Sequence, residues 1–267
     1  MNDRKLTEKT FWENYWKSNY GKINNEVVEI KRSRENLNIN SILDIFDKYL
    51  PVNENFHVLE IGGAPGQYLI YMAKNFKYNV YSLDYSKVGN EYTFKNMAKA
   101  RIPVKVYEQD LFSENFSGSI PYFDMVYSLG FVEHFNDLDA VVKMHTKFLK
   151  SNGILMLGVP NLAGIYQYFL KITAPHLLSI HNTDSMNIKR WDRFEKELNL
   201  TPIFKGYIGG FEPRNMNKVE KNDPTVRFLH FIVKKMVWVF SPRFNFLRKW
   251  NGRYWSSYMI GIYKKNH

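Results

Sequence analysis

The sequence predicts an α/β fold, with a doubly wound, mostly parallel sheet of seven strands and an antiparallel last strand. Through the middle of the chain, short apolar stretches of strand length alternate with stretches of helical spacing, and strands joined by helices in this way lie parallel. The first of these strands, residues 57–61, runs into the glycine-rich turn Gly62-Gly63-Ala64-Pro65-Gly66. Because glycines let a ligand approach the backbone closely, we expect the binding site at this turn.

Two amphipathic helices are predicted before the sheet. Residues 6–20 carry Phe11, Trp12, Tyr15 and Trp16 at helical spacing, and residues 39–50 repeat an apolar face that Pro51 ends. We expect residues 1–50 to form a lid or cap, with Tyr15 and Trp16 facing the ligand. Phe11 and Trp12 are expected to pack against the sheet instead.

Five strands are predicted in the first part of the sheet, with helices between them. The strands are residues 57–61, 79–83, 104–108, 123–128 and 153–159, and the helices are residues 67–75, 87–100 and 138–150. Right-handed crossovers place a ligand at the carboxyl ends of such strands, near the point where the strand order reverses.

The pattern changes after residue 161. Residues 162–179 are mostly apolar, residues 187–198 have a helical pattern, and residues 203–211 and 257–263 are predicted as the last two strands. Residues 51–267 therefore form one predicted domain, which contains residues 212–254 as a basic, aromatic insertion before the last strand. A connection of this length is functional, internally structured or disordered, and its aromatic residues argue against disorder.

Composition narrows the classes of protein. The chain has no cysteine, which excludes disulfides and cysteine-ligated metal sites and is compatible with a reducing compartment. The N-terminus lacks the apolar core of a signal peptide, and no apolar run reaches the length that spans a bilayer. We expect a cytoplasmic protein, either soluble or peripheral to a membrane.

The positive charge is concentrated at the C-terminal end. Residues 213–267 hold 12 Lys and Arg against 2 Asp and Glu, whereas the rest of the chain is almost neutral. Such asymmetry indicates an anionic partner or a solvated basic face. Apolar residues flanked by basic ones favour peripheral membrane contact through residues 226–250, and nucleic acid is the competing partner. The simplest alternative is that the insertion is a cap packed over the acceptor pocket.

The carboxylate of Glu60, at the end of the first strand, indicates a ligand that carries positive charge. A turn that binds phosphates holds negative charge with backbone N–H groups, and Glu60 beside it would be repulsive. S-adenosylmethionine fits, because it carries an ammonium and a sulfonium and no phosphate. Asp84, at the end of the second strand, can accept hydrogen bonds from both ribose hydroxyls of an adenosine. Neither a G-x-G-x-x-G dinucleotide motif nor a phosphate-binding Gly-Lys-Ser/Thr sequence is present.

From about residue 55 to residue 161, the chain resembles the class I, Rossmann-like S-adenosylmethionine-dependent methyltransferases, in their small-molecule branch. The resemblance is carried by five motifs in order: 58–66, 83–85, 108–111, 123–135 and 149–161. It implies that Asp110 accepts the adenine amino group and that the Leu111 backbone meets the ring. The cofactor-binding residues that it implies are Glu60, Gly62, Gly63, Ala64, Gly66, Asp84, Tyr85, Asp110, Leu111, Ser128, Leu129 and Gly130, with Tyr15 and Trp16 from the N-terminal helix.

Two histidines are candidates for a catalytic base. Transfer of a methyl group from a sulfonium depends mainly on holding the reactants aligned, and an oxygen or nitrogen acceptor often also needs a base. His134 follows the fourth strand, where the acceptor should meet the methyl group, and it could alternatively only shape the pocket. His181 precedes a predicted helix, which the pair His181-Asn182 could instead cap.

No metal site is predicted. Some quinone-biosynthesis relatives carry E-x-x-E-H at this point, and Gly130 replaces the first acidic residue here.

The sequence as a whole predicts methyl transfer from S-adenosylmethionine, giving S-adenosylhomocysteine, to oxygen or nitrogen of a small-molecule or glycan- or lipid-linked acceptor, as in small-molecule or polysaccharide biosynthesis. The alternatives are an RNA or protein methyltransferase that docks through the basic C-terminal region, and a catalytically inactive cofactor-binding scaffold.

Overall fold

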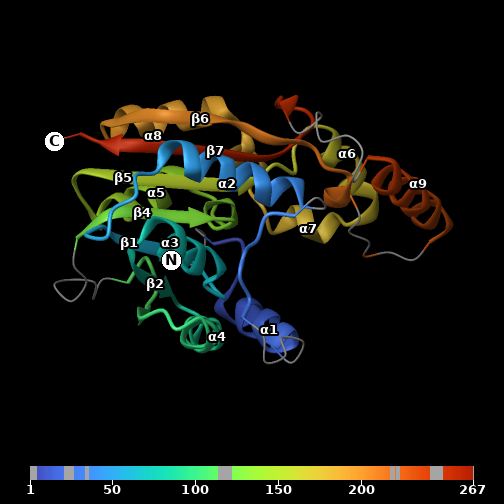
Figure 1. Ribbon diagram of the computed structural model, residues 1–267. Coiled ribbons are helices and arrows are strands. Elements are labelled where there is room, and N and C mark those ends of the chain that lie inside the picture. The colour runs from blue at the N-terminus through green and yellow to red at the C-terminus, as the bar shows by residue number, and fades with distance from the viewer. Residues whose placement is uncertain are drawn as a thin grey trace.

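A seven-stranded sheet in the order β3-β2-β1-β4-β5-β7-β6 forms the centre of the molecule (Figure 1). The computed structural model describes residues 5–20, 27–33, 36–113, 122–216, 220, 223–240 and 249–266. The strands are β1 His57–Ile61, β2 Asn79–Asp84, β3 Val104–Glu108, β4 Phe123–Leu129, β5 Leu149–Pro160, β6 Leu200–Phe211 and β7 Ser256–Lys265. Strands β1 to β5 pair in parallel, and β7 pairs antiparallel with both β5 and β6. The predicted fold class is confirmed.

Helices cover both faces of the sheet (Figure 1). In the described part of the chain they are α1 Lys9–Tyr20, α2 Leu37–Tyr49, α3 Gln67–Phe76, α4 Lys87–Lys99, α5 Leu138–Thr146, α6 Ile165–Thr173, α7 Pro175–Ser179, α8 Ile188–Glu197 and α9 Pro224–Phe240, with short 3₁₀ turns η3 Val132–His134, η4 Thr183–Met186 and η5 Pro213–Met216. None of the described helices is both long enough and apolar enough to cross a bilayer.

The apolar residues of β1 alternate between two buried clusters. Val58 packs with residues of α2 and α3 such as Phe46 and Leu69, whereas Leu59 and Ile61 pack on the other face with α5 and α8. A strand that is buried on both faces reads as a nearly continuous apolar run, and the run ends at the turn that begins with Gly62. This double packing fixes the end of β1 in place.

Element boundaries differ from the predictions mainly around residue 147. The predicted helix 138–150 ends at Thr146, and β5 begins at Leu149 rather than at residue 153, because Leu149 pairs with Phe123 of β4. The apolar stretch 162–179 forms α6 and α7, with Pro175 in the first turn of α7, where a missing N–H costs nothing. The insertion 212–254 holds η5 and α9, and its residues 217–219, 221–222 and 241–248 lie outside the described residues.

Candidate active site

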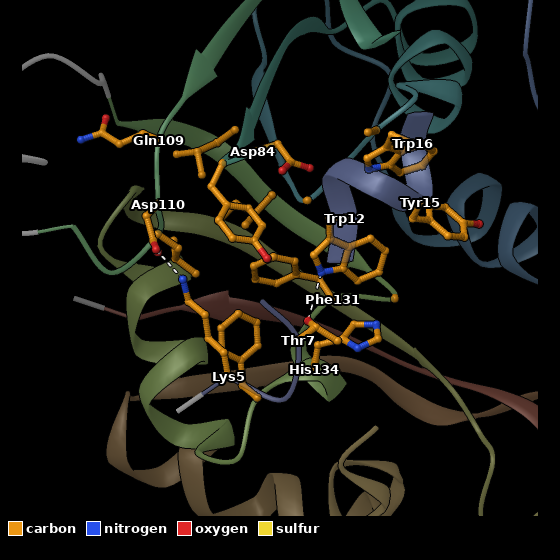
Figure 2. A pocket seen from close by; sticks show the side chains of 18 of the residues that line it. Lys5, Thr7, Trp12, Tyr15, Trp16, Asp84, Gln109, Asp110, Phe131 and His134 are labelled. Carbon is orange, nitrogen blue, oxygen red and sulfur yellow. Dashed lines mark hydrogen bonds and ion pairs between the residues drawn. The ribbon is translucent and has the colours of Figure 1, made fainter. Parts of the chain in front are cut away.

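A cavity of about 200 Å³ opens at the carboxyl ends of β1 to β4. The strand order reverses between β1 and β4, which is where open α/β sheets bind ligands. The walls come from the residues that directly follow these four strands and from the N-terminal segment, as Figure 2 shows. The cavity therefore lies where the topology predicted it.

The glycine turn packs too tightly for side chains. Gly62 has φ +70°, and a Cβ there would lie 2.3 Å from the Phe131 ring. A Cβ on Gly63 would lie 2.4 Å from the carboxylate of Glu60. Both glycines are thus required by close contacts, and Glu60 is held directly against the turn.

Glu60 is a buried carboxyl group with an incomplete set of partners. It is 3% exposed, and within the described part of the chain its Oε2 atom has no hydrogen-bond partner. Burial raises the pKa of Glu60 to about 8, against the opposing effect of the Tyr127 hydroxyl. A cationic group near the turn would reverse this shift, since an adjacent positive charge favours the ionised form.

Asp84 lies at the end of β2 and is held by the start of α4. Its Oδ1 accepts a hydrogen bond of 2.8 Å from the Ser86 backbone N–H, and Asn90 Nδ2 donates to its backbone carbonyl. Burial raises the pKa of Asp84 to about 6, although the backbone N–H groups of Ser86 and Tyr85 oppose the shift. The carboxylate is fixed in orientation and lines the cavity.

Asp110 has a partner from the N-terminal segment. Lys5 forms an ion pair with Asp110 (Figure 2). The Lys5 ammonium also lies 4.8 Å from the centre of the Tyr85 ring. The other carboxylate oxygen accepts from the Phe112 backbone N–H at 3.0 Å. A ligand that reaches Asp110 must therefore share this carboxylate with Lys5 or displace the lysine.

Residues 5–20 run across the cavity as a strap, attached at both ends. At one end, the Leu6 N–H donates to the His134 carbonyl at 2.8 Å. At the other end, the Glu13 carboxylate accepts from the Lys87 N–H at 2.7 Å, at the start of α4, where a negative charge is favourable. Beyond Glu13, the Trp16 indole packs so close to Gly89 that a Cβ there would lie 3.1 Å from its Nε1.

Trp12 faces the cavity, and the prediction that it packs on the sheet is wrong. Its ring meets the His134 ring edge to face at 5.0 Å, and its Nε1 donates to the Thr7 hydroxyl at 3.0 Å (Figure 2). Helical spacing showed that these aromatics share a face but not what that face covers. The strap turns this face toward the ends of the strands rather than toward the sheet.

The two candidate bases lie together, although they are 47 positions apart in the sequence. The rings of His134 and His181 are 4.6 Å apart between centres. His134 Nδ1 donates to the Ile180 carbonyl at 2.8 Å, and His181 Nδ1 donates to the Leu177 carbonyl at 2.6 Å. Burial lowers the pKa of His134 to about 4, with a further contribution from His181, and burial also lowers the pKa of His181. Both rings are neutral at pH 7.

Most of the predicted residues line the cavity. Those that do are Tyr15, Trp16, Gly62, Ala64, Asp84, Tyr85, Asp110, Leu111, Leu129, Gly130 and His134. Glu60, Gly63 and Gly66 lie behind the wall, and Ser128 is fully buried and bonded to His145. His181 is not among the lining residues, but its ring contacts that of His134, which is. The alternative that His181-Asn182 caps a helix also has support, because the Asn182 side chain accepts from the Asp184 N–H at the start of η4.

Sequence reasoning missed several lining residues. They are Lys5, Thr7, Ile61, Leu83, Gln109, Phe131 and Phe135. Gln109 and Phe131 lie inside the motifs 108–111 and 123–135, although neither was predicted as a site residue. Lys5 and Thr7 had no such signal, because only the path of the strap brings them to Asp110 and Trp12.

A family model and a curated protein match much of this chain. Residues 31–201 match the family model described as a methyltransferase domain. The ubiquinone biosynthesis O-methyltransferase of Pelagibacter ubique is 27% identical over 182 residues, which cover 67% of this chain and 70% of that protein.

Solved structures share the fold at low sequence identity. A putative sarcosine dimethylglycine methyltransferase from Galdieria sulphuraria is 12% identical, with a TM-score of 0.58, over 95% of this chain and 98% of that one. Phosphoethanolamine N-methyltransferase 2 of Haemonchus contortus, in complex with S-adenosyl-L-methionine, is 15% identical, with a TM-score of 0.55, over 84% of this chain and 52% of that one.

Proposed function

We propose that this chain, which belongs to the class I S-adenosylmethionine-dependent methyltransferases, methylates a hydroxyl oxygen or an amine nitrogen of a small-molecule acceptor. When bound, S-adenosylmethionine supplies a methyl group that its sulfonium makes electrophilic. The observation that carries the proposal is the position of His134, in the wall of the cavity that Asp84 and the glycine turn also line. A neutral imidazole beside a cofactor cavity suits an acceptor that loses a proton as it is methylated.

The residues that line the cavity, together with those directly behind its wall, fit S-adenosylmethionine. Glu60 supplies a buried carboxylate oxygen that lacks a hydrogen-bond partner, and such an atom suits a cationic group. Asp84 supplies an oriented acceptor for ribose hydroxyls, and the packed Gly62 and Gly63 leave the backbone uncovered by side chains. We propose these residues as the cofactor contacts, together with Gly66, Asp110, Leu111 and the backbone of 128–130.

His134 is the proposed catalytic base, with His181 behind it. Because Nδ1 of His134 donates to the Ile180 carbonyl, the neutral ring carries its lone pair on Nε2. That atom is able to take the proton of an acceptor hydroxyl while the oxygen lone pair forms the new bond to the methyl carbon. His181 holds the same tautomer through Leu177 and contacts the His134 ring, so it is placed to position the base.

The hydroxyl is the acceptor group that the comparisons favour. The curated relative from Pelagibacter ubique is an O-methyltransferase by name, although the solved structures include N-methyltransferases. No finding supports the two alternatives, an RNA or protein methyltransferase and an inactive scaffold. A glycan- or lipid-linked acceptor remains part of the proposal.

Radiolabelled methyl transfer tests the function. The full chain is incubated with S-adenosylmethionine and panels of phenols, hydroxylated isoprenoid precursors and amines, and S-adenosylhomocysteine is measured as the common product. For the acceptor that is turned over, His134→Ala should lower kcat by about 10²- to 10⁴-fold. His176→Ala is the matched control, since it removes an exposed histidine from α7. Unchanged turnover in both His134→Ala and His181→Ala would show that neither histidine is the base.

Within residues 1–50, the strap is proposed as a cap on the cofactor, whereas α2 packs in the core with Val58 of β1. Tyr15, Trp12 and Trp16 line the cavity, and the strap is fastened beside both His134 and α4. Deletion of residues 1–20 should weaken binding of S-adenosylhomocysteine, measured by calorimetry. Retained affinity in the deleted protein would show that the strap takes no part in binding.

Peripheral membrane contact is proposed for residues 226–250. On α9, Phe228 is 63% and Phe231 is 56% exposed, Ile232 lies on the same face, and Lys234 and Lys235 are exposed beside them. Exposed apolar residues next to basic ones suit an anionic lipid surface. Cosedimentation should occur with vesicles that contain an anionic lipid and should weaken for Phe228→Ser/Phe231→Ser. Equal binding to neutral vesicles, or none to either, would contradict the proposal. A cytoplasmic location remains a prediction.

A further inference from the structure

A third side chain joins the two histidines at the wall of the cavity. Glu133 precedes His134 in η3, and His181 follows α7. One potential ligand atom from each of these three residues lies within 4.8 Å of the others. The sequence separates His181 from the other two by more than 45 residues, and the Asn182 N–H binds the Glu133 carbonyl at 2.6 Å, which holds the two segments together.

Both histidines are fixed in the tautomer that a metal ion requires. Each Nδ1 donates to a backbone carbonyl, Ile180 for His134 and Leu177 for His181. The lone pair of each neutral ring is therefore on Nε2. Metal-binding histidines are commonly oriented by such a bond from the other nitrogen to a carbonyl.

Glu133 supplies a buried carboxyl oxygen without a hydrogen-bond partner. It is 1% exposed, and its Oε2 atom has no hydrogen-bond partner in the described part of the chain. A buried carboxyl oxygen without a partner is costly for the fold, and Glu133 has no salt bridge among the described residues. An unpartnered oxygen beside two oriented imidazoles is the arrangement that a cation completes.

We propose that Glu133, His134 and His181 bind a divalent first-row transition ion of the Zn²⁺ class. Bonds of about 2.0 to 2.2 Å place the ligand atoms of such an ion roughly 3 to 4 Å apart, so the three side chains need to close by only about an ångström. Two imidazoles and one carboxylate suit Zn²⁺, Fe²⁺ or Co²⁺, whereas Mg²⁺ prefers oxygen ligands.

The proposed site differs from the E-x-x-E-H motif, whose three side chains all come from one segment. Gly130 offers no side chain at the position one turn before Glu133, and a Cβ there would lie 3.5 Å from Glu133 Oε1. The third ligand comes instead from His181, across the fold. The sequence prediction of no metal site followed from Gly130 and could not see this replacement.

An ion at this place would also change how the acceptor hydroxyl loses its proton. This consequence rests on the proposed function, methyl transfer to a hydroxyl group. Three protein ligands leave a coordination position open, and His134 lines the cavity. An acceptor hydroxyl oxygen would occupy that position and lose its proton to solvent more readily, because a bound cation lowers the pKa of a coordinated hydroxyl. The histidines would then act as ligands, since Nε2 cannot hold both a proton and an ion.

Metal binding without cofactor tests the inference. The untagged full chain is stripped with a chelator and titrated with Zn²⁺ against a chromophoric competitor, with Mg²⁺ titrated by calorimetry. We expect one Zn²⁺ per chain and no stoichiometric Mg²⁺. His181→Ala should weaken Zn²⁺ binding by at least about 100-fold and Glu133→Gln by about 10- to 100-fold, whereas His176→Ala should change it by less than about twofold. In the Co²⁺-loaded protein, the visible absorption band should disappear with His181→Ala.

Several results would overturn the inference. They are the absence of stoichiometric Zn²⁺ binding, an equal loss in His176→Ala, or unchanged affinity in His181→Ala. Far-UV circular dichroism and S-adenosylhomocysteine binding check that each variant is folded, and His181→Gln replaces His181→Ala if the smaller residue unfolds the chain. Stoichiometric Zn²⁺ binding without methyl transfer to any acceptor would count against the proposed function and support the ion site.

Discussion

Replacing Glu60 with glutamine should stabilise the cofactor-free protein at neutral pH. The carboxyl group is buried against Gly63, and burial raises its pKa to about 8 from an ordinary value of 4.5. The folded chain therefore binds a proton at pH 7 that the unfolded chain releases. A group with a raised pKa stabilises the fold below pH 4.5, and this stability is lost as the pH rises toward 8.

The free-energy cost of keeping Glu60 protonated at pH 7 follows from the interval between pH 7 and the ordinary pKa of 4.5. Each pH unit in this interval is worth about 1.4 kcal/mol, so keeping Glu60 protonated costs up to about 3 kcal/mol at pH 7. Glutamine is neutral in both states and avoids this cost. Because the buried histidines His134, His145 and His181 titrate equally in both proteins, their effect cancels in the difference.

Urea unfolding of the cofactor-free protein at pH 4.5, 6, 7 and 8 measures the effect. The gain in unfolding free energy from Glu60→Gln should grow from near zero at pH 4.5 to about 2 to 3 kcal/mol at pH 7. Glu54→Gln, at an exposed glutamate, should show no such trend. The same Glu60→Gln protein should bind S-adenosylmethionine about 10- to 100-fold more weakly, since hydrogen bonds to charged groups are worth about 1.5 to 3 kcal/mol. A stability difference that is the same at pH 4.5 and pH 8 would refute the reasoning.

Three further substitutions test the site. Gly63→Ala places a Cβ 2.4 Å from the Glu60 carboxylate, and we expect a loss of about 1 to 3 kcal/mol in unfolding free energy together with weaker cofactor binding, measured by denaturation and calorimetry. Asp84→Asn keeps an oxygen for the Ser86 N–H but removes the charge, so the fold should survive. Calorimetry should show that S-adenosylhomocysteine binds about tenfold more weakly to this variant. Equal affinity would show that Asp84 does not bind the ribose. Lys5→Met breaks a half-exposed ion pair, so the unfolding free energy should change by less than about 1 kcal/mol while limited proteolysis cuts the strap faster; an unchanged cleavage rate would show that Lys5 does not hold the strap.

Much of the fold could be predicted because its signals are local. The strand ending at Ile61 is buried on both faces, so it reads as an apolar run that stops at the glycines. Asp84 and Asp110 stand directly after their strands, and parallel strands bring such positions to one edge of the sheet. The region around residue 147 was less predictable, since apolar residues alone do not separate the end of α5 from the start of β5.

No local sequence pattern predicted the contacts between segments that lie far apart in the chain. Trp12 shares a helix face with Trp16, and helical spacing does not say whether that face meets the sheet or the cavity. The ion pair of Lys5 with Asp110 joins residues 105 positions apart, and nothing near either residue in the sequence predicts the pairing.

The identity of the methyl donor thus follows from the amino-acid sequence by itself, because Glu60, the glycine turn and Asp84 occupy strand ends whose local pattern already implies their common edge. The surroundings of the acceptor depend on packing instead. His134 and His181 meet because the loop after α7 binds the Glu133 carbonyl through Asn182, and the strap contacts His134 through Trp12 and the Leu6 N–H. Such contacts arise from the packing of whole elements, which short-range sequence patterns do not encode.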